Sequence, residues 1–295
     1  MNKRKIWRFW ILLCVLMLTA CKTEPEKIAS TPQISSQSPT LTPTSLSPSA
    51  TPVDLAAQVN GEGITMVAYQ AEVERFRTAS GSELTPDDQS IIINNMIDQL
   101  LLAQAASQAG FNVDEAMLQN RIQKMGISEQ ELQTWIESHG YTQESFEHSL
   151  RLSIAAAWMR DQIIAEVPNN AEQVHARQIL LYNVEEAEDV LARLDNGADF
   201  ATLAEQYAPV TLGDLGWFPR GYLTVPELDE VVFDLAPEEH SDIIRTVLGF
   251  HIVQVIERDA EHTLSPDSYR AMQVQSLDDW LEHQRAQNEI MIYLP

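Results

Sequence analysis

The residue types that most often carry reaction chemistry are scarce in this chain of 295 residues. Its two cysteines, Cys14 and Cys21, both lie near the N-terminus, so the rest of the chain offers no disulfide, thiolate metal site or cysteine nucleophile. The seven histidines show none of the paired spacings of a metal site. His251 stands alone in an apolar run, which by itself is more typical of a structural histidine than of a catalytic one. These features argue against metal-dependent and cysteine-dependent chemistry.

The most distinctive stretch is GDLGWFPRG at residues 213–221, where three glycines and a proline surround Trp217 and Phe218. Three interpretations are open: a catalytic loop, a binding lip, or a tight turn whose aromatic side chains lie in a core. The elements on either side must decide between them.

The N-terminus has the pattern of an export signal. Four basic residues precede an uncharged run over residues 9–20, which is too short to favour a permanent membrane span. The run ends in Leu-Thr-Ala followed by Cys21, which resembles the lipobox of bacterial lipoproteins. An ordinary cleaved signal or an uncleaved anchor is the alternative. We expect a signal peptide at residues 1–20, lipid on Cys21, and an exported protein held at the extracytoplasmic face of the membrane.

Charge and composition describe the next segment and the surface. Residues 21–53 are dominated by Ser, Thr, Pro and Gln, which predicts a disordered tether because such a segment buries too little apolar surface to offset its ordering entropy. The whole chain has a formal net charge of −24, which disfavours nucleic acid and anionic lipid headgroups as partners.

Residues 54–170 predict a helical lobe. Residues 55–65 indicate a short strand, an Asn60-Gly61 turn and the entry to a helix. Helix caps then predict helices that begin at the following residues and end near Gly110, Gly140 and Val167: Thr85, Ser128 and Thr142. The last helix carries an apolar stripe, which favours a core over a ligand groove: Phe146, Leu150, Ile154 and Trp158.

Beyond Pro168 the pattern changes to a small α+β domain. Strands and helices alternate irregularly, as in an antiparallel sheet with flanking helices. We expect strands at 175–182, 241–246 and 250–258, and helices at 184–194, 200–207 and 226–235. The remainder, residues 264–295, begins with Ser265-Pro266 and predicts a capped helix through Ile292.

Five blocks in this order resemble one known domain. ARQIL, NGADFATLA, GDLGWFPRG, PELDEVVFDL and RTVLGFHIVQV are together similar to the parvulin (PpiC-type) peptidyl-prolyl isomerase domain over residues 173–258. VNGEGIT upstream and WLEHQR downstream resemble the chaperone lobe of PrsA- and SurA-type foldases. The resemblance implies an α+β protein in which a parvulin-type domain is inserted into a helical chaperone lobe, and in which residues 264–295 return to that lobe.

The implied reaction is rotation about an Xaa-Pro peptide bond, which crosses a barrier of roughly 18–20 kcal/mol. No bond is broken, so the site needs no nucleophile, metal or cofactor. It needs an apolar slot for the proline ring and polar groups that stabilise a twisted amide. The resemblance places the polar groups at His251, Thr246 and Gln178, and the slot at Leu215, Leu223 and Leu228.

The chain departs from the family pattern at several of these positions. Gln178 stands where the family has its first histidine, and His175, three residues earlier on the same strand, should point to the opposite face. The loop at 208–212 is shortened and has neither the cysteine nor the aspartate of the family, and Glu238 replaces a usual glycine. By the same resemblance, residues 213–218 build a short edge strand and residues 220–228 line the proline groove.

Three hypotheses of function follow. The first is an exported, lipid-anchored foldase that binds unfolded or partly folded exported proteins and isomerises their Xaa-Pro bonds, at a rate reduced by these departures. The second is a holdase chaperone whose parvulin domain binds without catalysis. The third is a solute-binding lipoprotein, which the element order disfavours because such proteins need two parallel α/β lobes.

Overall fold

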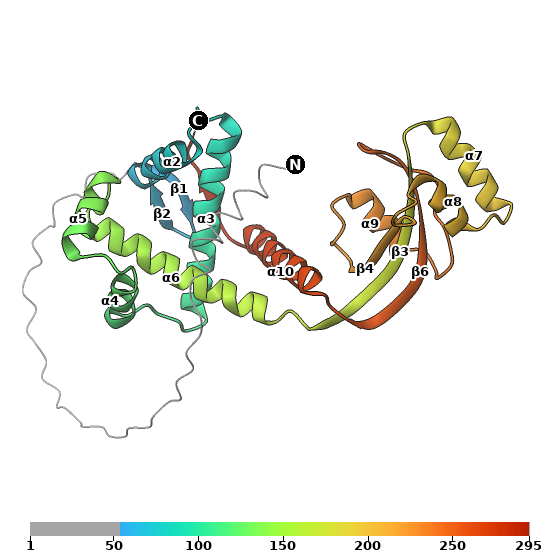
Figure 1. Ribbon diagram of the computed structural model, residues 1–295. Helices are drawn as coiled ribbons and strands as arrows, with labels where there is room; N and C mark the ends of the chain where they lie inside the picture. The colour runs from blue at the N-terminus through green and yellow to red at the C-terminus, as the bar shows by residue number, and fades with distance from the viewer. Residues whose placement is uncertain (1–53, 295) are drawn as a thin grey trace, which may run out of the picture.

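The computed structural model describes residues 54–294 of the chain. The predicted signal peptide, Cys21 and the predicted tether lie outside the described residues. Figure 1 shows a body built mostly of helices and a body built around a sheet, joined by a long two-stranded ribbon. We call them the helical lobe and the sheet domain. In chain order the elements are β1 (Leu55–Val59), β2 (Glu62–Thr65), α2 (Met66–Ser80), α3 (Pro86–Gln108), α4 (Glu115–Gln123), α5 (Glu129–Ser138), α6 (Gln143–Ala165), β3 (Asn170–Leu181), α7 (Val184–Asp195), α8 (Phe200–Tyr207), β4 (Asp214–Pro219), α9 (Pro226–Val232), β5 (Ile244–Thr246), β6 (Gly249–Thr263), α10 (Pro266–Gln287) and β7 (Ile290–Ile292).

A tight hairpin opens the helical lobe, as predicted. Asn60 and Gly61 have φ angles of 52° and 85°, and a two-residue turn with both central residues at positive φ matches the twist of paired strands. The side chain of Thr65 accepts a hydrogen bond from the backbone of Ala68 and caps α2. The chain therefore passes directly from the hairpin into the first helix.

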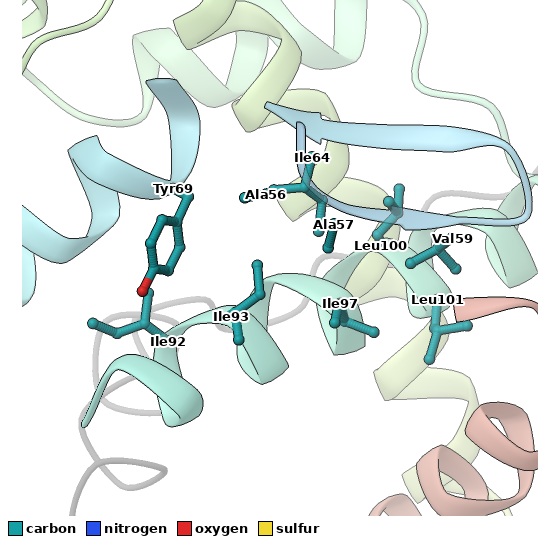
Figure 2. Close-up of a cluster of buried hydrophobic side chains, with 10 residues drawn as sticks. All are labelled: Ala56, Ala57, Val59, Ile64, Tyr69, Ile92, Ile93, Ile97, Leu100 and Leu101. Carbon is teal, nitrogen blue, oxygen red and sulfur yellow. The ribbon is translucent and has the colours of Figure 1, made fainter. Parts of the chain in front are cut away.

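The core of this lobe forms where α3 packs under the hairpin (Figure 2). Thr85 and Asp88 form a reciprocal capping box at the start of α3, with Pro86 in its first turn. Buried apolar side chains recur along one face of this helix. They meet the hairpin and Tyr69 of α2 in one cluster: Ala56, Ala57, Val59, Ile64, Tyr69, Ile92, Ile93, Ile97, Leu100 and Leu101.

The apolar stripe of α6 is core, as the pattern favoured. Phe146 and Leu150 are buried against α4 and α5, and Trp158 stacks on Phe111 with ring centroids 4.6 Å apart. Helix α4, capped by Asp114, was not predicted; it is short and has one buried residue, Leu118, so its periodic signal is weak.

The C-terminal segment returns to the helical lobe. Leu281 of α10 is buried against α3 and α6, and Arg285 donates to Asp98 of α3 at 2.7 Å. The prediction of one helix through Ile292 was wrong, because α10 ends at Gln287 and Ile290–Ile292 form β7 beside β1. The backbone N–H of Glu289 donates to the Asn60 side chain. Residues 290–292 therefore form a strand because β1, which is distant in the sequence, pairs with them.

The sheet domain has strand order β4-β3-β6-β5, with every pair antiparallel. Helices α7 and α8 cover one face of this sheet, and α9 packs against the other. The expected α+β class is thus confirmed. The antiparallel pairing does not match the two parallel lobes of a solute-binding protein.

Strands β3 and β6 are longer than predicted and form the ribbon of Figure 1. They pair from Leu181 and Phe250 inside the sheet domain to Asn170 and Thr263 beside the helical lobe. The N–H of Leu264 donates to the carbonyl of Asn169 at 2.9 Å, so the chain leaves and re-enters the lobe at adjacent points. The sheet domain is therefore an insertion with neighbouring ends.

Two predicted elements are shorter in the structure. Helix α9 ends at Val232 instead of Leu235, and only Ile244–Thr246 of the segment 241–246 is a strand. Between them Glu238 has a φ angle of 68°, in the left-handed region that favours glycine. The glycine that the resemblance implies at this position would adopt this backbone conformation without strain.

Candidate active site

The candidate site centres on His251, which lies in β6 between its neighbours β3 and β5. His251 is 1% exposed and pairs with Leu180 on one side and Ile244 on the other. Gln178 pairs with Val253, two residues along β6 from His251, so the Gln178 and His251 side chains lie on the same face of the sheet.

A chain of hydrogen bonds holds the imidazole ring. The Nδ1 atom of His251 lies 2.9 Å from Oε1 of Gln178, and its Nε2 atom lies 2.9 Å from the hydroxyl of Thr246. Because an amide oxygen only accepts, this assignment puts the ring proton on Nδ1. The hydroxyl of Thr246, which accepts from the Leu248 N–H, then donates to Nε2. The structure thus brings His251, Thr246 and Gln178 together.

This environment favours the neutral ring. Burial lowers the pKa of His251 below its ordinary value, and the carboxylate of Glu227 in α9 acts in the opposite direction. A neutral His251 can both accept and donate, as the hydrogen bonds require. Glu227 was not among the predicted site residues, because its proximity depends on how α9 packs.

Gly213 fixes the position of Gln178. The Gln178 N–H donates to the Gly213 carbonyl at 2.8 Å, and a Cβ atom on Gly213 would lie 2.0 Å from the Gln178 carbonyl oxygen. With a φ of 73°, this residue needs glycine for its conformation and for its close approach to β3. The first glycine of GDLGWFPRG therefore positions Gln178 through its backbone.

The rest of that stretch is mostly scaffold. Residues Asp214–Pro219 form the edge strand β4, as predicted, and Phe218 is fully buried beneath α9. Trp217 stacks on His262 of the ribbon with centroids 4.1 Å apart. His175 lies 2.9 Å from the Asp214 carboxylate and 5.6 Å from the Trp217 ring centroid, away from His251.

The three leucines assigned to the slot gather on the sheet face that carries His251. Leu215 and Leu223 are partly buried against the cluster under α9, and Leu228 is 4% exposed within it. Leu228 is therefore part of the core, and Leu215 and Leu223 keep more of their apolar surface accessible.

Asp229 is a positioning residue that the sequence interpretation missed. It is a buried carboxylate in α9, and both of its oxygens accept from the backbone N–H of Gly221 at 3.0 and 2.9 Å. This contact ties Gly221, near the start of the segment 220–228, to α9. The available signal was an acidic residue placed between the apolar positions Leu228 and Val232 of a short helix.

A cavity of about 240 Å³ lies next to Gln178, one of the polar residues of the candidate site. It lies between the end of β3 and the segment after α8, and its lining includes Gln178, Leu180, Tyr182, Tyr207 and Leu215. Within residues 54–294, no three His, Cys, Asp or Glu side chains gather as a metal site would require. None of the helices in that range has the length and apolar character of a membrane span.

Comparison with known proteins agrees with this architecture. The sequence profile of the SurA-like N-terminal domain matches residues 2–160, and that of the PPIC-type PPIASE domain matches residues 163–259. The fold and the site thus define a helical lobe of the SurA type joined to a rotamase-type domain. The chain belongs to the family with a SurA-like N-terminal domain, and it carries a PPIC-type PPIASE domain. The resemblance inferred from the five blocks is confirmed.

Individual relatives are distant. Foldase protein PrsA of Halalkalibacterium halodurans is 29% identical over 195 residues, which are 63% of this chain and 55% of that protein. Chaperone SurA of Thiobacillus denitrificans is 28% identical over 260 residues, 72% of this chain and 58% of that protein. The chain thus spans little more than half the length of these two relatives. The crystal structure of a peptidylprolyl isomerase (PrsA) from Bacillus cereus is 19% identical, with a TM-score of 0.44, over 77% of this chain and 83% of that one.

The buried ring of His251 predicts a specific pH dependence of stability. In an unfolded chain the pKa of a histidine side chain is about 6.5. Because the folded pKa is lowered, the unfolded chain binds the proton more readily, and stability must rise with pH through this range. The contribution of neutral His251 is complete above the unfolded pKa and is lost as the pH falls from there toward the folded pKa.

We therefore predict that the free energy of unfolding falls more steeply between about pH 7 and pH 5 in the wild type than in His251→Gln. Urea unfolding of both proteins at several pH values measures this difference. Parallel pH curves, or an NMR titration of the His251 ring at or above about pH 6.5, would contradict the assignment.

Proposed function

We propose that the protein is an extracytoplasmic foldase that binds unfolded exported proteins and isomerises their Xaa-Pro bonds, at a lower rate than parvulins with an intact histidine pair. The observation that carries this proposal is the Gln178–His251–Thr246 network beside an apolar cluster, within the segment that matches the PPIC-type domain. The names of the relatives, foldase and chaperone, support the same role.

The site suits rotation of an amide. Rotation breaks the conjugation of the peptide bond and localises the lone pair on the proline nitrogen, so a donor near that atom stabilises the transition state more than the ground state. The oxygen of Gln178 is engaged by His251, and its amide nitrogen is the group that can donate to substrate. Leu215 and Leu223 offer apolar surface to the proline ring.

Two features predict a reduced rate. Gln178 can hold the His251 ring but, unlike a second histidine, cannot titrate with it. The loop at 208–212, Ala-Pro-Val-Thr-Leu, has no cysteine or aspartate to face the substrate carbonyl. These same features favour the alternative function, a holdase whose sheet domain binds proline-containing segments without accelerating their isomerisation.

Chaperone activity belongs, in this proposal, to the helical lobe. Large apolar side chains are exposed on and between α4 and α5, where the flexible methionines can adapt to varied partners: Met117, Met125, Ile127 and Trp135. Client proteins with a positive net charge are favoured, because the chain itself has a formal net charge of −24.

Lipid anchoring through Cys21 completes the proposal, and the lipobox-like sequence supports it. Cys21→Ser should release the protein from the membrane fraction or leave the precursor uncleaved, because a serine cannot take the thioether lipid. Fractionation and intact-mass measurement of both forms provide the test. A variant with unchanged mass and unchanged membrane partition would show that the anchor lies elsewhere.

Removal of the sheet domain should leave chaperone activity largely intact. Asn170 and Thr263 are paired neighbours, so a short Gly-Ser linker can join them without strain. We expect this deletion variant to be folded by circular dichroism and to suppress aggregation of a denatured client. Ile127→Ala in the full chain should weaken suppression while leaving the fold unchanged, because Ile127 is 44% exposed between α4 and α5. A folded deletion variant with no suppression at all would refute the assignment to the helical lobe.

Substitution of Gln178, where the chain departs from the pattern that the resemblance implies, tests catalysis. Gln178→His should raise the isomerisation rate on Xaa-Pro peptides several-fold, because the new ring would face His251 from the neighbouring strand and restore the histidine pair that the resemblance implies. The gain is limited because the loop at 208–212 is unchanged. His251→Ala should lower the activity that remains, with little change in peptide affinity, which depends on the apolar cluster.

Rates and dissociation constants for the wild type and both variants decide between the two functions. A wild type with no measurable rate but normal peptide affinity would support the holdase. A wild-type rate equal to that of an intact parvulin and insensitive to His251→Ala would mean that the reaction occurs at another site.

A further inference from the structure

The sequence before β1 contains the chemical group that the sheet domain is proposed to take. The predicted tether, residues 21–53, holds six Xaa-Pro bonds, and in five of them serine or threonine precedes the proline. These five prolines follow one another at intervals of four to seven residues: Pro32, Pro39, Pro43, Pro48 and Pro52. A repeated Ser/Thr-Pro sequence is therefore part of the same chain as the candidate site.

The charge of the tether suits a groove on an acidic protein. No charged residue occurs between Lys27 and Asp54, whereas the whole chain has a formal net charge of −24. An uncharged segment is not repelled by carboxylates near the site, such as that of Glu227 beside His251. Leu215 and Leu223 are only partly buried, which leaves apolar surface for a proline ring.

One contact holds the groove beside the helical lobe. The Gln275 side chain of α10 packs on Gly221, where an added Cβ atom would lie 2.3 Å from Oε1 of Gln275. Gly221 lies near the start of the groove segment 220–228. Figure 1 shows α10 between the helical lobe and the sheet domain. The groove segment therefore touches the helix that leads back to β1.

This contact sets the distance from the groove to the tether. From Gln275, α10 continues to Gln287, which is about 18 Å at 1.5 Å per residue. The stretch from there to Tyr293, whose N–H donates to the carbonyl of Ala56, adds about 20 Å. The groove thus lies roughly 40 Å from the start of β1, where the tether joins the described chain.

The length of the tether determines which of its prolines reach the groove. Pro39 and Pro32 precede Asp54 by fifteen and twenty-two residues, or about 50 Å and 75 Å of extended chain, so both reach it. Pro48 and Pro52 lie six and two residues before Asp54, and at most about 20 Å of chain leaves them short. A segment linked in this way has an effective concentration of about 1 mM at the groove.

We propose that the proline groove of the sheet domain binds the chain's own tether as an intramolecular ligand, through the Xaa-Pro bonds at Pro32 and Pro39. The tether is then a built-in competitor, which occupies the groove in the absence of a client and is displaced by a client that binds more tightly. The inference rests on the proposed function and extends it, because it names one particular ligand of the groove.

The test uses the chain from Lys22 to Pro295, which carries no lipid, and a short uncharged Thr-Pro peptide as the external ligand. One variant combines Pro32→Ala with Pro39→Ala. The matched control combines Pro48→Ala with Pro52→Ala, which removes two prolines of the same kind that fall short of the groove. All four positions lie outside the described residues, so neither variant changes the packing of the sheet domain.

Dissociation constants of the peptide are obtained from shifts of the Gln178 backbone amide signal, which reports on this site and not on the helical lobe. Two tether prolines at about 1 mM, each with a dissociation constant of about 1 mM, leave about one third of the grooves free. The Pro32/Pro39 variant should therefore bind the peptide about threefold more tightly than the wild type, and the control should not. Without peptide, the wild-type Gln178 signal should already be displaced toward its peptide-bound position.

Equal affinities and equal Gln178 shifts in all three proteins would overturn the inference, and so would an equal gain in both variants, because the effect would not depend on reach. If the peptide is then still isomerised in a manner sensitive to His251→Ala, the proposed function stands. A difference that disappears on dilution of the protein would assign the docking to the tether of a second copy and contradict the intramolecular contact. Absence of any peptide-induced shift in all three proteins would overturn both the inference and the proposed function.

Discussion

The antiparallel pairing of β3 with β6 is the interaction on which the rest of the structure depends. These two strands are the centre of the four-stranded sheet, and their outer ends form the ribbon to the helical lobe. The same register puts Gln178 and His251 on one face. A slip of one residue would turn one of them to the face covered by α7 and α8 and break the hydrogen bond between them.

The candidate site combines a close-packed scaffold with polar groups that depart from the pattern the resemblance implies. Gly213 meets the backbone of β3 where a side chain would clash, and Asp229 ties Gly221 to α9. The altered residue, Gln178, fits this scaffold because its amide oxygen accepts from the imidazole. Glutamine has no titratable ring, so in the proposed function we expect its effect to fall on the rate more than on the fold or on the groove.

Local signals in the sequence predicted the elements well. The capping boxes at Thr85 and Ser128 and the Asn60-Gly61 turn act within a few residues, and each lies where it was predicted. Strand β7 could not be foreseen in this way, because residues 290–292 become a strand only through β1, which is more than two hundred residues away in the sequence. The extended ends of β3 and β6 likewise stabilise each other across a long loop.

The candidate site could be predicted only in part, because some of its features depend on packing between segments that are distant in the sequence. The resemblance assigned Gln178, His251 and Thr246, and these three side chains do meet. The burial of Leu228, the proximity of Glu227 to His251, and the cavity lined by Tyr182 and Tyr207 all depend on how α9 and the α8–β4 segment pack on the sheet. No pattern within one segment contains that information.

The most direct test of the central claim, that holding and isomerisation reside in separate bodies, is proline-limited refolding of one unfolded client. The slow phase of that refolding is followed with substoichiometric full-length protein and with the variant that lacks the sheet domain. Our account predicts that the full chain accelerates the slow phase modestly, and that the helical lobe alone suppresses aggregation without changing the slow rate. Acceleration by the helical lobe alone, or an unchanged slow phase with the full chain, would contradict it.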